Sequence, residues 1–209
     1  MISAAFLIAV TPLPDVADLL DCAREERVSL VASSEPADGV AFRTVRFSDA
    51  YAFLAELLAA ETGEYLLIVW PDGADLAGLA RQVESTGMNR RVLIAAATEA
   101  EAATIRAETP DAGLLMTGIT EHYEVLSSEL DQRAMAAWFD YFPDAHTEYF
   151  LAGQGIETVI PDFPFAETMS AEDFALVRQQ HIEILITDQP EDAIAAFGRA
   201  GDNCPAGGE

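Results

Sequence analysis

Ile182–Phe197, with the sequence IEILITDQPEDAIAAF, is the stretch that decides the fold. Its apolar, β-branched start is typical of a buried strand, and Thr187-Asp188-Gln189-Pro190 ends that strand. Pro190 suits the first turn of a helix, and the acids after it suit the positive end of the helix dipole. The stretch is therefore one strand–turn–helix unit. Asp188 falls at the carboxyl end of its strand, where α/β proteins place their ligands.

Strand and helix signals alternate along the rest of the chain in the same way. Besides the opening stretch, strands are predicted at 4–10, 28–32, 65–70, 91–97, 113–117, 135–141 and 156–161. Helices are predicted at 16–26, 49–62, 74–85, 99–108, 121–133, 144–152, 170–180 and 190–197. Residues 40–45 are interpreted as a short hairpin-like extension.

Eight strands, each followed by a helix, within 209 residues predict a compact (β/α)8 TIM barrel. A doubly wound open sheet is the alternative, because strand order cannot be read from a sequence. We assign residues 1–200 to a single barrel domain and expect 201–209, rich in Gly and Pro, to form a flexible tail.

Composition limits the partners and the compartment. The chain has 36 acidic residues against 11 basic ones, all of them Arg, and a net charge of −25. Such a surface repels nucleic acids and anionic membranes, and no apolar run is long enough to span a membrane. The apolar Met1–Val10 lacks a basic start and is interpreted as a strand rather than a signal peptide. Cys22 and Cys204 suggest no disulfide framework, which predicts a cytoplasmic protein.

The opening stretch resembles the terminal segment G-I-I-T-D-x-P-D-x-A of the glycerophosphodiester phosphodiesterase family. Residues 91–100 and 105–115 are similar to its segment R-V-x-I-S-S-F…L-R…P-x…G-L-L. Phe47–Leu54 stands where that family has the helix start P-T-L-x-E-x-L, and Val28–Gly39 is similar to its strand V-E-x-D-V…D-G. The resemblance implies a barrel and, for an active member, hydrolysis of glycerophosphodiesters in lipid metabolism.

The positions that carry catalysis in that family hold other residues here. The family has His-Arg at the end of its first strand, Glu-x-Asp on the second, a further His soon after, and Glu-x-Lys on the third. At these positions this chain has, in order, Val10-Thr11-Pro12, then Ser29 and Val31, then Thr44-Val45, then Val69 and Pro71. The sequence contains no lysine that another alignment could supply.

The expected ligand face carries carboxylates and hydroxyls, and no His or Arg is predicted there. Asp72, Asp140, Asp162 and Asp188 form a hypothetical Ca²⁺ or Mg²⁺ site, since these ions prefer oxygen ligands. The alternative is that each Asp is a turn residue or a helix cap. For ligand binding we select Asp162, Asp188 and Ser33, and for acid–base catalysis Asp140, His146 and His122.

Two functions remain open at this point. The first is a catalytically degenerate barrel that binds a small-molecule or protein partner, including a second copy of itself in a homodimer. The second is a divergent, metal-dependent phosphodiester hydrolase acting on glycerophosphodiesters. A subunit that completes the site of another chain is a third interpretation.

Overall fold

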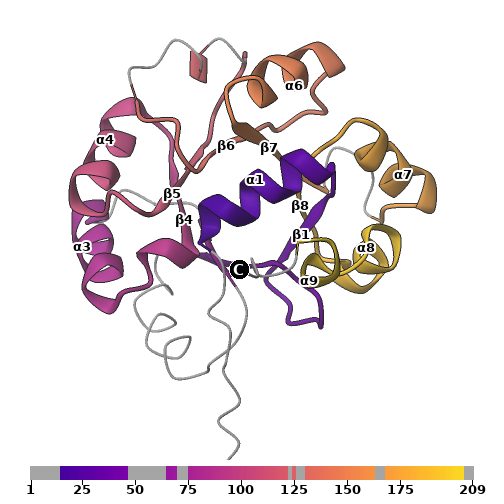
Figure 1. Ribbon diagram of the computed structural model, residues 1–209, viewed down its shortest axis with the longest axis horizontal. Coiled ribbons are helices and arrows are strands. Elements are labelled where there is room, and N and C mark those ends of the chain that lie inside the picture. The colour runs from indigo at the N-terminus through magenta and orange to yellow at the C-terminus, as the bar shows by residue number, and fades with distance from the viewer. Residues whose placement is uncertain are drawn as a thin grey trace, which may run out of the picture.

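The chain folds as a closed barrel of eight parallel strands surrounded by helices (Figure 1). The structure is a computed structural model that describes residues 15–46, 65–69, 75–121, 124–125, 130–162 and 168–204. The strands are β1 (Leu30–Ser33), β2 (Phe42–Arg46), β3 (Tyr65–Val69), β4 (Val92–Ala96), β5 (Gly113–Met116), β6 (Met135–Trp138), β7 (Ile156–Pro161) and β8 (Ile184–Ile186). The predicted (β/α)8 fold class is therefore confirmed.

The first two strands are not those expected from the sequence. The barrel closes where β1 pairs with β8, with Leu30 opposite Ile184, and β1 also pairs with β2, with Ala32 opposite Phe42. Residues 28–32 thus belong to the first strand instead of the second, and the expected hairpin-like extension is β2. The strand expected at 4–10 lies outside the described residues. The expected extension covered residues 40–45, whereas Phe42–Arg46 is a barrel strand, of which only alternate residues need to point inside.

The helices begin and end close to where the caps place them. They are α1 (Val16–Glu26), α3 (Leu76–Thr86), α4 (Glu99–Glu108), α6 (Ala145–Ala152), α7 (Ala171–Gln179), α8 (Pro190–Phe197) and α9 (Ala200–Asn203), with the 3₁₀ helix η1 (Asn89–Arg91). A capping box opens α4, because the Glu101 N–H donates to Thr98 Oγ1 over 3.2 Å while Glu101 Oε2 accepts from the Thr98 N–H. The helix expected at 49–62 lies outside the described residues.

Two apolar layers hold the fold together. The outer layer packs the helices against the barrel, with Leu79 and Val83 of α3 and Phe174 and Val177 of α7 among its buried members. The inner layer fills the barrel with alternate strand residues, as small parallel barrels require. Its members from the strands are Leu30, Ala32, Phe42, Tyr65, Leu67, Leu93, Ala95, Leu115, Ala136, Trp138, Val159 and Ile184.

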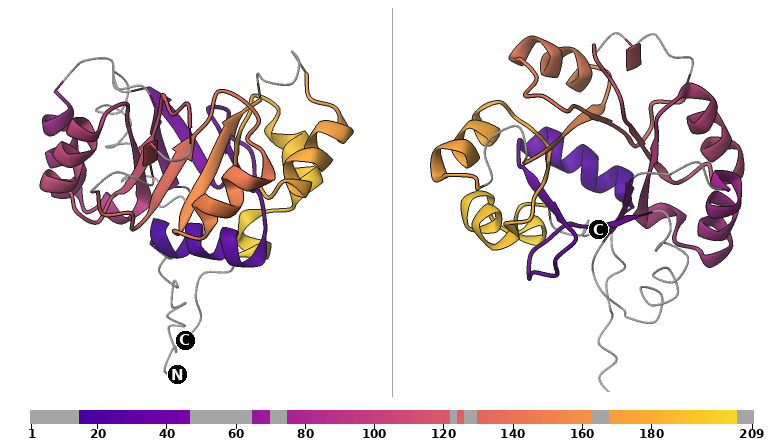
Figure 2. Two further views of the ribbon diagram at one scale, coloured as in Figure 1. Left: turned by 90° about the horizontal axis from the view of Figure 1, so that it is seen from above. Right: turned by 180° about the vertical axis from the view of Figure 1, so that it is seen from behind.

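Helix α1 covers the amino-terminal end of the barrel. Val16, Leu19, Leu20 and Ala23 are buried and belong to the same cluster as the barrel interior. The helix runs across the barrel axis in Figure 1, and Figure 2 shows it beneath the strands. Each of its larger apolar side chains contributes about 1.5–3 kcal/mol by burial. The mouth that remains open for ligands is therefore the carboxyl-terminal end.

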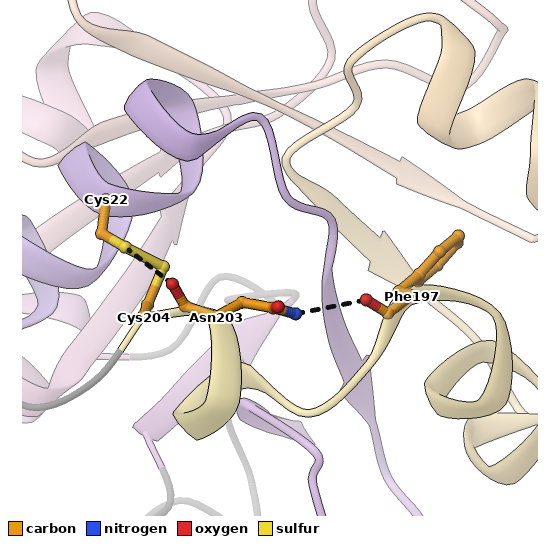
Figure 3. The surroundings of a disulfide bond; sticks show 4 residues. All are labelled: Cys22, Phe197, Asn203 and Cys204. Atoms are coloured by element: carbon orange, nitrogen blue, oxygen red, sulfur yellow. Dashed lines mark hydrogen bonds between the residues drawn. A yellow bond between two sulfur atoms is a disulfide. The ribbon is translucent and has the colours of Figure 1, made fainter.

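A disulfide joins α1 to the end of the described chain, which corrects two expectations. Cys22 and Cys204 are bonded, with their Cα atoms 5.8 Å apart (Figure 3). The prediction of unpaired cysteines was wrong, because only the fold brings these distant segments together. The flexible tail also does not start at residue 201, since α9 forms there and Cys204 is buried. The Asn203 side chain donates to the Phe197 carbonyl over 3.2 Å and fixes this turn.

The helices in the described part of the chain are all too short or too polar to cross a membrane.

Candidate functional site

Asp162 and Asp188 lie together at the carboxyl ends of β7 and β8. The Asp188 N–H donates to Asp162 Oδ2 over 3.0 Å, and the Asp162 N–H donates to the Ile186 carbonyl over 2.9 Å. The negative charge of Asp162 raises the pKa of Asp188 above its usual range, with a smaller contribution from burial. Both residues were predicted to bind ligand, and the structure brings them together at the mouth.

Asp140 lies beyond the end of β6 and is held by a buried tryptophan. The Trp138 indole N–H donates to Asp140 Oδ1 over 2.7 Å, and Trp138 belongs to the apolar cluster inside the barrel. Asp140 itself is exposed. Its carboxylate therefore keeps one oxygen bonded to the barrel core while solvent reaches the side chain, an arrangement that suits a ligand contact at the mouth.

Arg46 is a mouth residue that the sequence did not lead us to expect. It ends β2, and it has the same strand parity as Phe42, which points into the barrel. The Arg46 side chain is exposed, and within the described ranges no carboxylate forms an ion pair with it. The prediction that no Arg lies on this face was wrong, because it rested on treating this segment as an extension outside the barrel.

A small pocket of about 140 Å³ opens between the ends of β4 and β5. Thr98, Thr117 and Glu124 supply its polar lining and Ile119 part of its apolar lining. Thr98 is occupied in capping α4, and the Thr117 N–H bonds to the Ala96 carbonyl. Both residues line this pocket at the carboxyl ends of the strands. A pocket of this size admits a hydroxyl-bearing fragment rather than a large cofactor.

The remaining predicted residues are placed less favourably or are not described. Ser33 is fully buried, and its hydroxyl accepts from the Glu35 N–H over 3.1 Å, which argues against direct ligand contact. His146 lies exposed on α6 with its ring 4.6 Å from that of Phe150. His122 and Asp72 lie outside the described residues.

The metal hypothesis is incomplete in the described part of the chain. No group of three or more His, Cys, Asp or Glu residues there is arranged to hold a metal ion. The described residues alone therefore do not fit a resident Ca²⁺ or Mg²⁺. The full set of four ligands depends on Asp72, and the hypothesis stays a prediction.

The positions that matter in the resembled family shift with the first strand. Because β1 is Leu30–Ser33, the first strand ends in Ser33-Ser34 rather than in Val10-Thr11-Pro12. On β2 the inward positions toward the mouth are Thr44 and Arg46 by strand parity. The residues of this chain that stand at the catalytic positions of the resembled family are therefore different from those expected from the sequence. None of them is a histidine or belongs to a Glu-x-Asp pair.

Comparison with known proteins shows similarity of fold and no detectable similarity of sequence family. No protein-family model matches the sequence, and no curated protein matches it. A glycerophosphoryl diester phosphodiesterase from Parabacteroides distasonis superposes with a TM-score of 0.69 at 12% identity, covering 89% of this chain and 92% of that one. A second such enzyme from the same organism gives 0.50 at 10% identity, covering 69% and 63%.

A Galdieria sulphuraria protein described as a candidate glycerophosphodiester phosphodiesterase gives a TM-score of 0.55 at 14% identity, covering 70% of this chain and 63% of that one. Identities this low establish similarity of fold and leave activity to be argued from the site. The chain is an eight-stranded α/β barrel that is structurally similar to glycerophosphodiester phosphodiesterases.

Proposed function

We propose that this chain is a glycerophosphodiester phosphodiesterase-like barrel that binds a phosphodiester ligand at its mouth without hydrolysing it. The observation that carries the proposal is the replacement of the resembled family's reactive residues within a similar barrel. Ser33 ends β1 and Ser34 follows it, Thr44 and Arg46 take the inward positions of β2, and the sequence has no lysine. The sequence has no histidine before His122, so the first half of the barrel supplies no imidazole for proton transfer near neutral pH.

The charges around the mouth indicate the class of ligand. Arg46 on β2 offers a cation and a fork of donors suited to a phosphate group. Asp140, Asp162 and Asp188 follow β6, β7 and β8, on the other side of the barrel mouth. A ligand with an anionic phosphodiester and a cationic end can therefore bind Arg46 with its phosphate and the aspartates with its cationic end. Glycerophosphocholine has this distribution of charge, and it is the probe we select.

Calorimetric titration tests this binding. We expect glycerophosphocholine to bind the intact protein, and Arg46→Ala to weaken binding about tenfold or more, since hydrogen bonds to charged groups contribute about 1.5–3 kcal/mol. The matched control is Arg81→Ala, because Arg81 is also exposed but lies on α3. Glycerophosphoglycerol, which lacks the cationic end, should bind more weakly. Equal binding by wild type and Arg46→Ala would contradict the proposed site.

The second candidate function is a metal-dependent hydrolase, and the contact between Asp162 and Asp188 favours it. Turnover of bis-p-nitrophenyl phosphate and glycerophosphodiesters, measured with and without Ca²⁺ or Mg²⁺, separates the two functions. We expect no turnover under either condition. Metal-dependent turnover that disappears in Asp140→Asn or Asp188→Asn would overturn the proposal of a non-hydrolytic barrel.

The disulfide bears on the compartment in which the protein works. Disulfides persist in oxidising environments and are rare in the cytoplasm. The Cys22–Cys204 bond therefore supports an oxidising compartment over the cytoplasm that the sequence led us to expect. Thiol labelling of the protein in its native cells, before any exposure to air, tests this: blocked cysteines are expected, and free thiols would restore the cytoplasmic assignment.

A further inference from the structure

A second pocket, of about 300 Å³, lies at the opposite end of the barrel from the mouth. It is an open pocket lined by the end of α1, by α6, and by the end of α7 with the segment that leads to β8. Figure 2 shows α1 across this end, with α6 beside it. Glu148 and Tyr149 of α6 line the pocket, together with Arg24 and Arg27 from the α1 side and Glu183 just before β8. The pocket is separate from every residue considered above for ligand binding.

Three buried carboxylates cluster at this pocket. Glu148 and Glu183 are each 7% exposed and line it, and Glu157 of β7 is 1% exposed behind them. Glu183 accepts the Thr158 N–H over 2.8 Å. Among the described residues, Glu148 Oε1 and Glu157 Oε2 have no hydrogen-bond partner. Buried carboxylate oxygens left without donors are costly, so the cluster requires protons or a positively charged ligand.

The positive charge nearby does not balance the cluster. Arg24 forms an ion pair with Glu157 and another with Asp21 Oδ1 at 2.5 Å, so its guanidinium is shared between two carboxylates. Within the described part of the chain no Arg forms an ion pair with Glu148, and the charges of Glu183 and Asp144 act on it unfavourably. The other charged or titratable groups around the pocket are Arg27 of the α1 C-cap and His181 before β8. The excess of acids remains after Arg24 is counted.

Protonation is how this cluster is neutralised near neutral pH. Burial, reinforced by Glu183 and Asp144, raises the pKa of Glu148 to about 8. Burial also raises the pKa of Glu157 to about 8, against the opposing effect of Arg24, and that of Glu183 to about 7. A bound cation would replace a proton here, so binding and proton release must be linked.

We propose that this pocket binds a small organic ammonium ion, with the ammonium group near Glu148 and Glu183. Ala145 and Ala152 provide apolar lining for an alkyl chain, and the Tyr149 ring, 75% exposed, offers an aromatic face to a cation. Among the described residues, no three His, Cys, Asp or Glu side chains are arranged to hold a metal ion, the three carboxylates of this cluster included. An alkylammonium ion supplies the hydrogen-bond donors that the buried carboxylates lack and an alkyl chain that fits the apolar lining.

Titration calorimetry with n-butylammonium tests the proposal on the intact protein. At pH 8.5 we expect binding, with the release of up to about one proton, detected by repeating the titration in buffers of different ionisation enthalpy. At pH 6 we expect binding to be at least about tenfold weaker, because protons then occupy the carboxylates. The neutral isostere 1-butanol should bind at least about tenfold more weakly at either pH, since it lacks the charge.

Two variants complete the experiment. Glu148→Gln keeps the shape of the protonated side chain, and should fold and bind n-butylammonium at least about tenfold more weakly. Glu172→Gln is the control, because Glu172 is an exposed acid of α7 outside the pocket, and it should bind as wild type does. The proposal is overturned if n-butylammonium does not bind at pH 8.5, if 1-butanol binds as well, if no proton is released, or if Glu148→Gln binds like wild type.

Discussion

Removing the Cys22–Cys204 disulfide is expected to weaken the fold without abolishing it. The bond joins residues separated by 182 positions, so it closes nearly the whole chain into a loop. A chain-entropy estimate for a loop of this length is about 5 kcal/mol, and native disulfides typically contribute about 2–5 kcal/mol. For a protein of this size, each kcal/mol corresponds to about 2–4 °C in melting temperature. The loss should therefore lie between about 4 and 20 °C.

The apolar contacts of α1 are the reason for expecting a folded product. Val16, Leu19 and Leu20 remain buried against the barrel interior whether or not Cys22 is bonded. Without the bond, the unfolded chain gains freedom while the native packing stays the same. The double variant Cys22→Ser/Cys204→Ser should then show a native circular dichroism spectrum and a lower free energy of unfolding.

Urea denaturation of the wild type, with and without dithiothreitol, and of the double variant gives the comparison. Reduction should lower the stability of the wild type to about that of the double variant and should leave the double variant unchanged. Alkylation and mass spectrometry establish the thiol state in each sample. The reasoning is refuted if the double variant is as stable as the oxidised wild type within about 0.5 kcal/mol, or if the untreated protein carries two free thiols.

Further predictions concern the buried acid, the mouth and the helices. Burial raises the pKa of Glu148 to about 8, so its protonated form favours folding, and stability contributed by this group is lost as pH rises from about 4.5 through 8. Glu148→Gln should therefore be more stable than wild type at pH 9 and close to it at pH 5 in urea denaturation. Asp162→Asn should lower the pKa of Asp188 toward its usual range, as followed by carboxyl NMR titration, since Asp162 is the main cause of the shift. An unchanged titration would show that the two carboxylates do not interact. Leu20→Ala should cost about 2–5 kcal/mol, because it opens a cavity between α1 and the barrel, and a loss below about 1 kcal/mol would mean that α1 does not close the barrel. Thr98→Ala should cost about 0.5–2 kcal/mol by removing the α4 cap, with Thr98→Ser as the control that keeps the hydroxyl.

Local features of the fold were predictable from the sequence because they depend on neighbouring residues. The bounds of α1, α4 and α8 match the expected helices, since caps and apolar spacing act within one or two turns. The strand at 156–161 was also placed correctly. The alternation of strands and helices was enough to favour a barrel, and the closed parallel strand order confirms it.

The candidate site was predicted in part, and its errors have a common origin. Asp162 and Asp188 follow strands that were correctly assigned, and so they lie at the mouth together. Arg46 was missed because its strand was interpreted as an extension, and the choice between two short segments depends on which one pairs with β8. Ser33 was expected to meet a ligand, but it is fully buried at the end of β1 and its hydroxyl accepts from the Glu35 N–H. A sequence pattern marks the end of a strand more reliably than the direction of each side chain.

By itself, the sequence determined that this chain alternates strands and helices, that acids and hydroxyls follow several strands, and that its surface is strongly acidic. The tertiary structure decided which strand begins the barrel, that α1 closes its amino-terminal end, and that Cys22 meets Cys204. It also gathered Glu148, Glu157 and Glu183 beside one pocket. The physical reason is one of range: propensity, capping and periodicity act between neighbours in the chain, whereas barrel closure, disulfide pairing and the burial of charge depend on segments that only folding brings together.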